Sequence, residues 1–206
     1  MDGSFLKTQL TKINSELQNA KLIAVTKKQP IEKIEFLYQL GQRIFAENYV
    51  QEFLEKKEKL NHLEIKWHLI GPLQSNKVLK IVGEIELIHS VDSLELAQKI
   101  SNAAIEKKVI QNILIQLNIS GEGSKSGFSM NQFEKLKKQL FSLKNIRILG
   151  FMMMPLMTQN AEDSRKYFKS LKQIQIDTKK EYDFINELSM GTTQDYKIAL
   201  EEGSTM

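Results

Sequence analysis

Apolar residues recur at intervals of three and four between Leu6 and Leu17, and this spacing predicts an amphipathic helix over residues 3–19. A different pattern follows: a short, wholly apolar run over residues 22–25, which leads into Lys27. Runs of this length that are apolar on both faces are typical of parallel strands buried within a sheet. The start of the chain therefore predicts a helix and then a strand.

The same alternation continues to the end of the chain. Further strands are predicted over residues 44–46, 65–70, 85–91, 113–119, 146–154 and 184–190. Helical patterns lie between and after them, over residues 30–41, 49–60, 77–82, 92 onward, 129–143, 162–181 and 194–202. Two of these helices open on the pattern of a capping box, formed by Asp92 with Glu95 and by Ser129 with Gln132.

Strict alternation of strand and helix predicts a parallel sheet with right-handed crossovers in a single α/β domain, residues 1–206. Two architectures compete. A doubly wound open sheet usually carries a glycine fingerprint after its first strand, and none stands there. A (β/α) barrel needs eight strands and typically about 250 residues, whereas this chain reaches Ser204-Thr205-Met206 where an eighth strand would begin.

Composition narrows the class of protein. With 41% hydrophobic and 26% charged residues, the chain is not a disordered segment. The absence of cysteine excludes disulfides, thiolate metal sites and cysteine nucleophiles. The sequence has no apolar run of about 18 residues and no signal-peptide core, so we expect a cytoplasmic protein with no membrane partner.

The net charge of +4 is weak evidence for a nucleic-acid partner. Only Arg43, Arg147 and Arg165 are arginines, and the remaining basic residues are lysines mixed with glutamates. Proteins that read nucleic acids favour the bidentate guanidinium. We therefore interpret the basic residues as a solvated surface and expect no nucleic-acid partner.

Candidate chemistry belongs at the carboxyl ends of the strands, where ligands bind in both architectures. Lys27 follows the most apolar strand, so we expect its amine to be partly desolvated and nucleophilic. The alternative is a solvated loop lysine, since Lys28 follows directly.

The segment from Ser189 to Thr193 lies between a strand and a helix. Gly191 would let backbone approach a ligand closely, and Thr192 or Thr193 would cap the helix, which favours a phosphate there. An ordinary helix cap is the alternative. The glycine-rich loop 121–127 lacks the spacing of a Walker motif.

The remaining candidates have simpler interpretations. His62, His68 and His89 have no metal-ligand spacing, and we expect each to make a local hydrogen bond. Met152, Met153 and Met154 fit strand and core positions. The sequence contains no serine elbow.

Several segments together resemble the pyridoxal phosphate homeostasis protein family (YggS/PROSC type). They occur in the family's order and spacing: Ala24-Val25-Thr26-Lys27, Phe45-Ala46-Glu47-Asn48-Tyr49-Val50-Gln51-Glu52, Trp67-His68-Leu69-Ile70-Gly71-Pro72-Leu73-Gln74-Ser75-Asn76-Lys77, Asn118-Ile119-Ser120, Ser124-Lys125-Ser126-Gly127, Leu188-Ser189-Met190-Gly191 and Glu202-Gly203-Ser204-Thr205-Met206. The resemblance covers residues from about 20 to 206.

The resemblance implies the barrel found at the N-terminus of alanine racemase, of the TIM type and here without its last strand. It implies that pyridoxal 5′-phosphate is held as a Schiff base on Lys27. It also implies that Ser189, Gly191, Thr192 and Thr193 form the phosphate loop. The residues that match positions lining the pocket are Asn48, His68 and Met153.

The sequence departs from the family's pattern at three places. Ala46 replaces a glycine, and Thr193 replaces a serine. The family continues past Ser-Thr-Met with a strand that carries an arginine and a glycine-threonine pair, which this sequence does not contain. We therefore expect unpaired edges on the first and seventh strands, weaker cofactor binding and lower stability than in a longer relative.

The function that the resemblance implies is to bind and buffer the cofactor, and so to contribute to vitamin B6 and amino-acid homeostasis without established catalysis. Two alternatives stay open: a fold-type III pyridoxal-phosphate enzyme such as an amino-acid racemase, and a degenerate scaffold that binds no cofactor. We expect a monomer.

Overall fold

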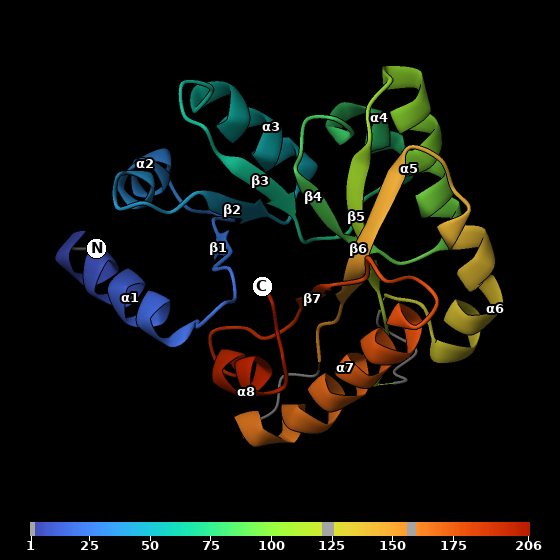
Figure 1. Cartoon of the computed structure of the whole chain (residues 1–206). Coiled ribbons are helices and arrows are strands. Elements are labelled where there is room, and N and C mark those ends of the chain that lie inside the picture. The colour runs from blue at the N-terminus through green and yellow to red at the C-terminus, as the bar shows by residue number, and fades with distance from the viewer. Residues whose placement is uncertain (1–2, 121–125, 156–159) are drawn as a thin grey trace.

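The strands that the structure describes lie in one parallel sheet. The computed structural model describes residues 3–120, 126–155 and 160–206. In this part of the chain seven strands follow one another in sequence order across the sheet (Figure 1). They are β1 Ala24–Val25, β2 Ile44–Glu47, β3 Lys66–Leu69, β4 Leu87–Val91, β5 Gln111–Gln116, β6 Ile146–Met152 and β7 Glu187–Ser189.

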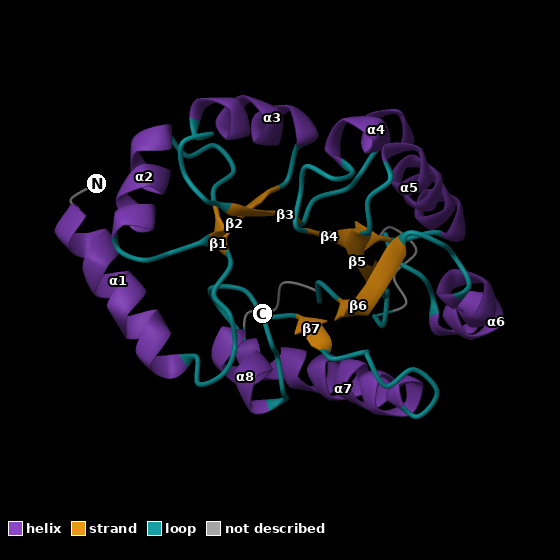
Figure 2. Cartoon of the chain, turned by 45° about the horizontal axis from the view of Figure 1, so that its top comes forward, coloured by secondary structure: helices purple, strands orange, loops and turns teal. Residues whose placement is uncertain are grey.

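Helices connect these strands and surround the sheet on its outer side (Figure 2). They are α1 Gly3–Glu16, α2 Ile31–Gln39, α3 Val50–Lys59, α4 Val78–Ile81, α5 Leu94–Lys107, α6 Met130–Phe141, α7 Arg165–Lys179 and α8 Tyr196–Glu201, with short 3₁₀ turns at Ser75–Lys77 and Ala161–Ser164. The sheet curls about a central axis, and β1 and β7 are not paired. This confirms a TIM-type barrel without its last strand and excludes the open, doubly wound sheet.

The segment 204–206 lies between β7 and the residues that lead into β1 (Figures 1 and 2). The N–H groups of Thr205 and Met206 donate to the carbonyl of Leu188, at 3.0 and 3.2 Å. On the other side, the Lys21 N–H donates to the Thr205 carbonyl at 2.9 Å. The expectation of an unpaired edge is therefore wrong for β7, whereas beside β1 the bond lies at Lys21, before the strand begins.

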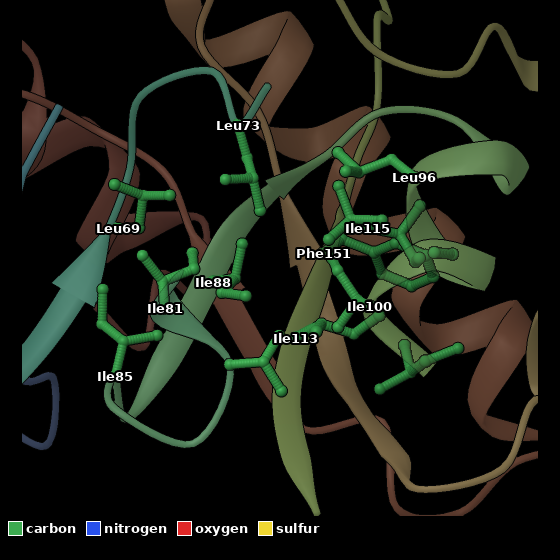
Figure 3. Packing of buried hydrophobic residues seen from close by; sticks show 14 of the residues in the cluster. Leu69, Leu73, Ile81, Ile85, Ile88, Leu96, Ile100, Ile113, Ile115 and Phe151 are labelled. Atoms are coloured by element: carbon green, nitrogen blue, oxygen red, sulfur yellow. The ribbon is translucent and has the colours of Figure 1, made fainter. Parts of the chain in front are cut away.

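Two apolar layers follow from the alternation of side chains along the strands. Outward-facing residues such as Ile88, Ile113 and Phe151 are fully buried against the helices, in the main core (Figure 3). Their neighbours Leu87 and Leu114 point the other way, into a smaller cluster inside the barrel with Met152. Apolar side chains thus fill part of the barrel interior.

Of the two predicted capping boxes, one is confirmed and one is wrong. The Ser129 hydroxyl accepts from the Gln132 N–H, and the Gln132 side chain accepts from the Ser129 N–H. Before α5, however, the cap is Ser93, whose hydroxyl accepts from the Leu96 N–H at 3.3 Å. Asp92 precedes this cap, and Glu95 pairs with a lysine one turn along the helix.

Candidate functional site

The predicted site residues lie near the carboxyl ends of five strands. Lys27 follows β1, Asn48 follows β2, and His68 lies in β3. Met153 follows β6, and the segment from Ser189 to Thr193 runs from the end of β7. Because the carboxyl ends of parallel strands meet at one rim, the fold gathers these residues at the same end of the barrel.

A hydrogen-bonded chain crosses the barrel interior below this rim. The Nδ1 atom of His68 lies 2.9 Å from Nε2 of His89, and Nδ1 of His89 lies 2.8 Å from the Ser189 hydroxyl oxygen. His68 is 4% exposed and His89 is fully buried. These partners lie on β3, β4 and β7, so the expectation of local hydrogen bonds for these two histidines is wrong.

The register of the strands explains this meeting. His68 pairs with Leu87 across β3 and β4, so His89, two residues further on, faces the same side as Leu87. His89 is not among the predicted site residues. Its spacing of two residues from Leu87 could have identified it, but this spacing is informative only once the register of β3 and β4 is known.

Burial lowers the pKa of both histidines. Burial, helped by the positive charges of Lys21 and Lys66, lowers the pKa of His68 to about 4 from its ordinary value of 6.5. Burial likewise lowers the pKa of His89 well below 6.5, and His68 adds to the effect. The pair is therefore neutral at physiological pH.

We expect the folded chain to lose stability in mild acid. Above pH 6.5 both histidines are neutral in the folded and unfolded states, so they contribute no pH dependence. As the pH falls from 6.5 toward 4, His68 becomes protonated in the unfolded chain but stays neutral in the folded chain. The free energy of unfolding should drop by up to about 3 kcal/mol from His68 alone.

Urea titrations from pH 7.5 to 4.5 would measure this dependence. The double variant His68→Gln/His89→Gln should show a much weaker dependence of the unfolding free energy on pH. The control variant His62→Gln removes an exposed histidine and should keep the dependence of the wild type. An equal slope in the wild type and the double variant would refute the assignment.

The expectation that Lys27 is desolvated is wrong. Its side chain is exposed, as is that of Val25, two residues earlier. Within the described residues the Lys27 amine makes no hydrogen bond or ion pair. Its neighbour Thr26 is buried, and the Thr26 hydroxyl donates to Oε1 of Glu47 at 2.6 Å. The turn thus anchors one side chain in the protein and leaves the lysine amine accessible.

Asn48 presents an unsatisfied acceptor at the rim. Its Oδ1 atom is buried and has no hydrogen-bond partner among the described residues. Gly71, in the turn after β3, packs directly on the backbone of Asn48: a Cβ atom at Gly71 would lie 2.2 Å from the Asn48 carbonyl oxygen. Buried acceptors of this kind are uncommon in folded proteins and call for a donor.

The loop after β7 differs in detail from the prediction. Helix α8 begins at Tyr196, its N-cap is Asp195, and neither threonine caps it. Instead, the Asp195 carboxylate accepts from the N–H of Thr192 at 2.7 Å and lies 3.1 Å from its hydroxyl. Thr193 is exposed, and within the described residues its N–H and hydroxyl make no hydrogen bond.

Gly191 is required by both conformation and space. Its φ angle of +90° lies in the left-handed region, and a Cβ atom there would stand 2.6 Å from Cβ of Ala199. The loop can therefore lie close against α8 only with glycine at this position.

Met153 is placed in the main core, with 4% of its surface exposed. Its N–H donates to the Ser189 carbonyl at 3.1 Å, which ties the end of β6 to the end of β7. Met152 is also buried, whereas Met154 is 54% exposed. The interpretation as strand and core residues is confirmed for Met152. Met153 is a core residue just beyond the end of β6, and for the exposed Met154 the interpretation is wrong.

The part of the chain that the structure describes contains neither a metal-binding cluster nor a membrane-spanning helix. No group of three or more histidines and carboxylates is arranged to hold a metal ion. Among these residues no helix is both long and apolar enough to cross a membrane. The resembling segment at Ser124-Lys125 lies outside the described residues.

Comparison with known proteins identifies the family. The sequence matches the family described as "Alanine racemase, N-terminal domain" over residues 2–204. A pyridoxal phosphate homeostasis protein of Aquifex aeolicus is 39% identical over 188 residues, which are 91% of this chain and 82% of the relative. The chain belongs to the pyridoxal phosphate homeostasis protein family. The homeostasis protein of Pasteurella multocida is 38% identical over 195 residues, 90% of this chain and 82% of the relative.

Solved structures agree with this assignment. PipY of Synechococcus elongatus, determined with pyridoxal phosphate bound, has a TM-score of 0.91 and 32% identity, covering 97% of this chain and 94% of that chain. Alanine racemase of Clostridium difficile has a TM-score of 0.72 and 18% identity, covering 87% of this chain and 48% of that chain. The racemase shares the fold of the homeostasis proteins, and at this identity the likeness shows nothing further.

Proposed function

We propose that this chain binds pyridoxal 5′-phosphate at the carboxyl rim of the barrel and contributes to vitamin B6 and amino-acid homeostasis. One observation carries the proposal: the structure of PipY with pyridoxal phosphate bound matches the fold of this chain over nearly its whole length. The relatives in the family are named for homeostasis of the same cofactor.

The residues at the rim fit such a ligand. When bound, pyridoxal 5′-phosphate supplies an aldehyde that a primary amine can hold covalently and reversibly. Lys27 offers an exposed amine that makes no hydrogen bond within the described residues, and we assign the covalent hold to it. Asn48 offers a buried acceptor that lacks a donor, which a polar group of the ligand would satisfy.

The loop after β7 would hold the phosphate. Gly191 brings the backbone close, and the N–H and hydroxyl of Thr193 are available within the described residues. The Asp195 carboxylate already takes the Thr192 N–H. We therefore assign the main phosphate contacts to Thr193 and Gly191, with Thr192 contributing once Asp195 releases it. Ser189 and His68 would form the floor of the site, held by His89.

We propose that the chain holds the cofactor rather than turning over a substrate on it. The two buried histidines are neutral and bound to each other, so neither is poised to exchange protons near pH 7. Proton-transfer catalysis needs an acid or base whose pKa lies near the working pH.

The test is a titration of purified chain with pyridoxal 5′-phosphate, followed by visible absorption and by co-elution of the cofactor on gel filtration. We expect one equivalent of protein-bound cofactor and no racemisation of alanine above that of free cofactor. Folded protein that retains no cofactor would contradict the proposal, and racemisation by the chain would contradict its non-catalytic part.

A further inference from the structure

A network of side chains holds the turn that carries Lys27 from both sides. After the lysine, the N–H of Lys28 donates to Oε1 of Glu52 at 2.6 Å. Before it, the carbonyl of Thr26 accepts from Nζ of Lys56 at 2.6 Å. Glu52 and Lys56 lie one turn apart on α3 and are themselves 2.6 Å apart. One helix thus holds the backbone immediately before and immediately after Lys27.

The held conformation is one that the backbone does not adopt readily. Lys28 has a φ angle of +57°, in the left-handed region that is unfavourable for residues with a side chain. Such a conformation persists only where its surroundings determine it. A backbone hydrogen bond from the Gln29 N–H to the Thr26 carbonyl, 2.9 Å long, closes the turn. Within the described residues the only hydrogen bond of the Lys28 N–H is to Glu52, so this carboxylate is the side chain that holds the turn at Lys28.

The network formed by Glu47, Glu52 and Lys56 is rigid because Lys56 is buried and all its hydrogen-bond donors have partners. Its side chain is 8% exposed, and its Nζ donates to Oε1 of Glu47 at 2.7 Å as well as to Glu52 and Thr26. An ammonium has three protons, and all three are used here. The Glu47 side chain is fully buried and Glu52 is 22% exposed, so the network reaches the surface at Glu52.

Both polar groups of Thr26 are held by this network. The Thr26 hydroxyl donates to Oε1 of Glu47 at 2.6 Å, and the Thr26 carbonyl accepts from Nζ of Lys56. Lys27 lies in the turn that follows, and its side chain is exposed. The network therefore holds the backbone beside Lys27 and leaves the lysine amine accessible.

We propose that Glu52 is a positioning residue for Lys27, acting through the backbone N–H of Lys28 and held in turn by Lys56. The role of Lys27 as the cofactor's anchor comes from the proposed function. The geometry adds that a carboxylate on α3 holds the backbone beside that anchor before any ligand arrives.

The decisive comparison is Glu52→Ala against Glu55→Ala. Both replace a glutamate on α3, but Glu55 is exposed and bonds only to Gln51 among the described residues. A third variant, Glu52→Gln, keeps an acceptor oxygen for the Lys28 N–H. Thermal unfolding of each protein is recorded first, to confirm that it is folded.

The first readout needs no cofactor: amide hydrogen exchange of Lys28. We expect exchange to accelerate at least tenfold in Glu52→Ala, to stay unchanged in Glu55→Ala and to return close to the wild-type rate in Glu52→Gln. The second readout is the dissociation constant for pyridoxal 5′-phosphate, which should rise about tenfold in Glu52→Ala and recover in Glu52→Gln.

The two readouts separate the two proposals. Unchanged exchange in Glu52→Ala, or faster exchange with unchanged cofactor affinity, would overturn the positioning role and leave the proposed function intact. Wild-type protein that binds no cofactor would overturn the proposed function and with it the role of Glu52 toward an anchor, whatever the exchange rates show.

Discussion

Replacing Gly150 by alanine should lower the free energy of unfolding by at least about 3 kcal/mol, beyond the usual cost of overpacking. A Cβ atom at this position would stand 1.8 Å from the carbonyl oxygen of Glu187 and 2.9 Å from its nitrogen. These are backbone atoms of the paired strand β7, since Gly150 and Glu187 are partners in the register. The two strands must separate, because no side-chain rotation relieves the clash.

The consequence should reach the site. Strand β7 is only three residues long, and its last residue, Ser189, accepts the N–H of Met153 and contacts His89. Separation of β6 from β7 would break these connections, so cofactor affinity should fall together with stability.

The matched control is Gly41→Ala. Gly41 has a φ angle of +99°, but a Cβ atom there would meet nothing within 4 Å. Only the backbone strain of a left-handed residue then applies, on the order of 1–2 kcal/mol. Urea unfolding followed by circular dichroism measures both variants. If Gly150→Ala cost no more than Gly41→Ala, the close approach of β6 and β7 would be refuted.

Replacing Lys27 by glutamine should weaken binding of pyridoxal 5′-phosphate on the order of a hundredfold, about 2.7 kcal/mol. The variant keeps a polar side chain, one atom shorter and uncharged, but removes the primary amine that we assign to the aldehyde. The phosphate loop and Asn48 remain in this variant. We therefore expect weak binding of the cofactor without the visible absorption band of the covalent form. Since Lys27 is exposed, the thermal stability without cofactor should not change.

The control for this variant is Lys66→Gln, which removes an exposed lysine at the amino end of β3, the opposite end of the barrel. It should bind the cofactor like the wild type. Equal weakening in both variants would show a general effect of charge, and no weakening in Lys27→Gln would move the anchor to another residue.

The order of elements was predictable because hydrophobic spacing changes so clearly between strand and helix, but the ends of the elements were not. The apolar run 22–25 predicted a longer first strand than the observed Ala24–Val25. The reason is a side chain: Nε2 of Gln42 donates to the carbonyl of Leu22, so a glutamine replaces the strand ladder there. The sequence around Leu22 does not reveal that Gln42 will bind its carbonyl.

Helix starts show the same limit. Asp92 and Ser93 are both good caps, and local sequence does not decide between them; the structure uses Ser93. The final helix was expected from residue 194 and begins at Tyr196. Here Asp195 binds the N–H of Thr192, which favours a turn over an earlier helical start.

The site was predictable as a set of strand ends, through the family resemblance, but not as a set of contacts. His68 was assigned to the pocket, yet its bond to His89 depends on the register between β3 and β4. The pairing of Glu47 with Lys56 depends on how α3 packs over β2. Such contacts between distant residues arise only in three dimensions, and they are what hold the predicted residues in place.

The assignment of Lys27 as the anchor is tested most directly by reducing the complex of this chain with pyridoxal 5′-phosphate by borohydride and mapping the labelled peptide by mass spectrometry. We predict one phosphopyridoxyl group per chain, on Lys27. A label on another lysine, a label scattered over many lysines, or no label on folded protein would contradict it.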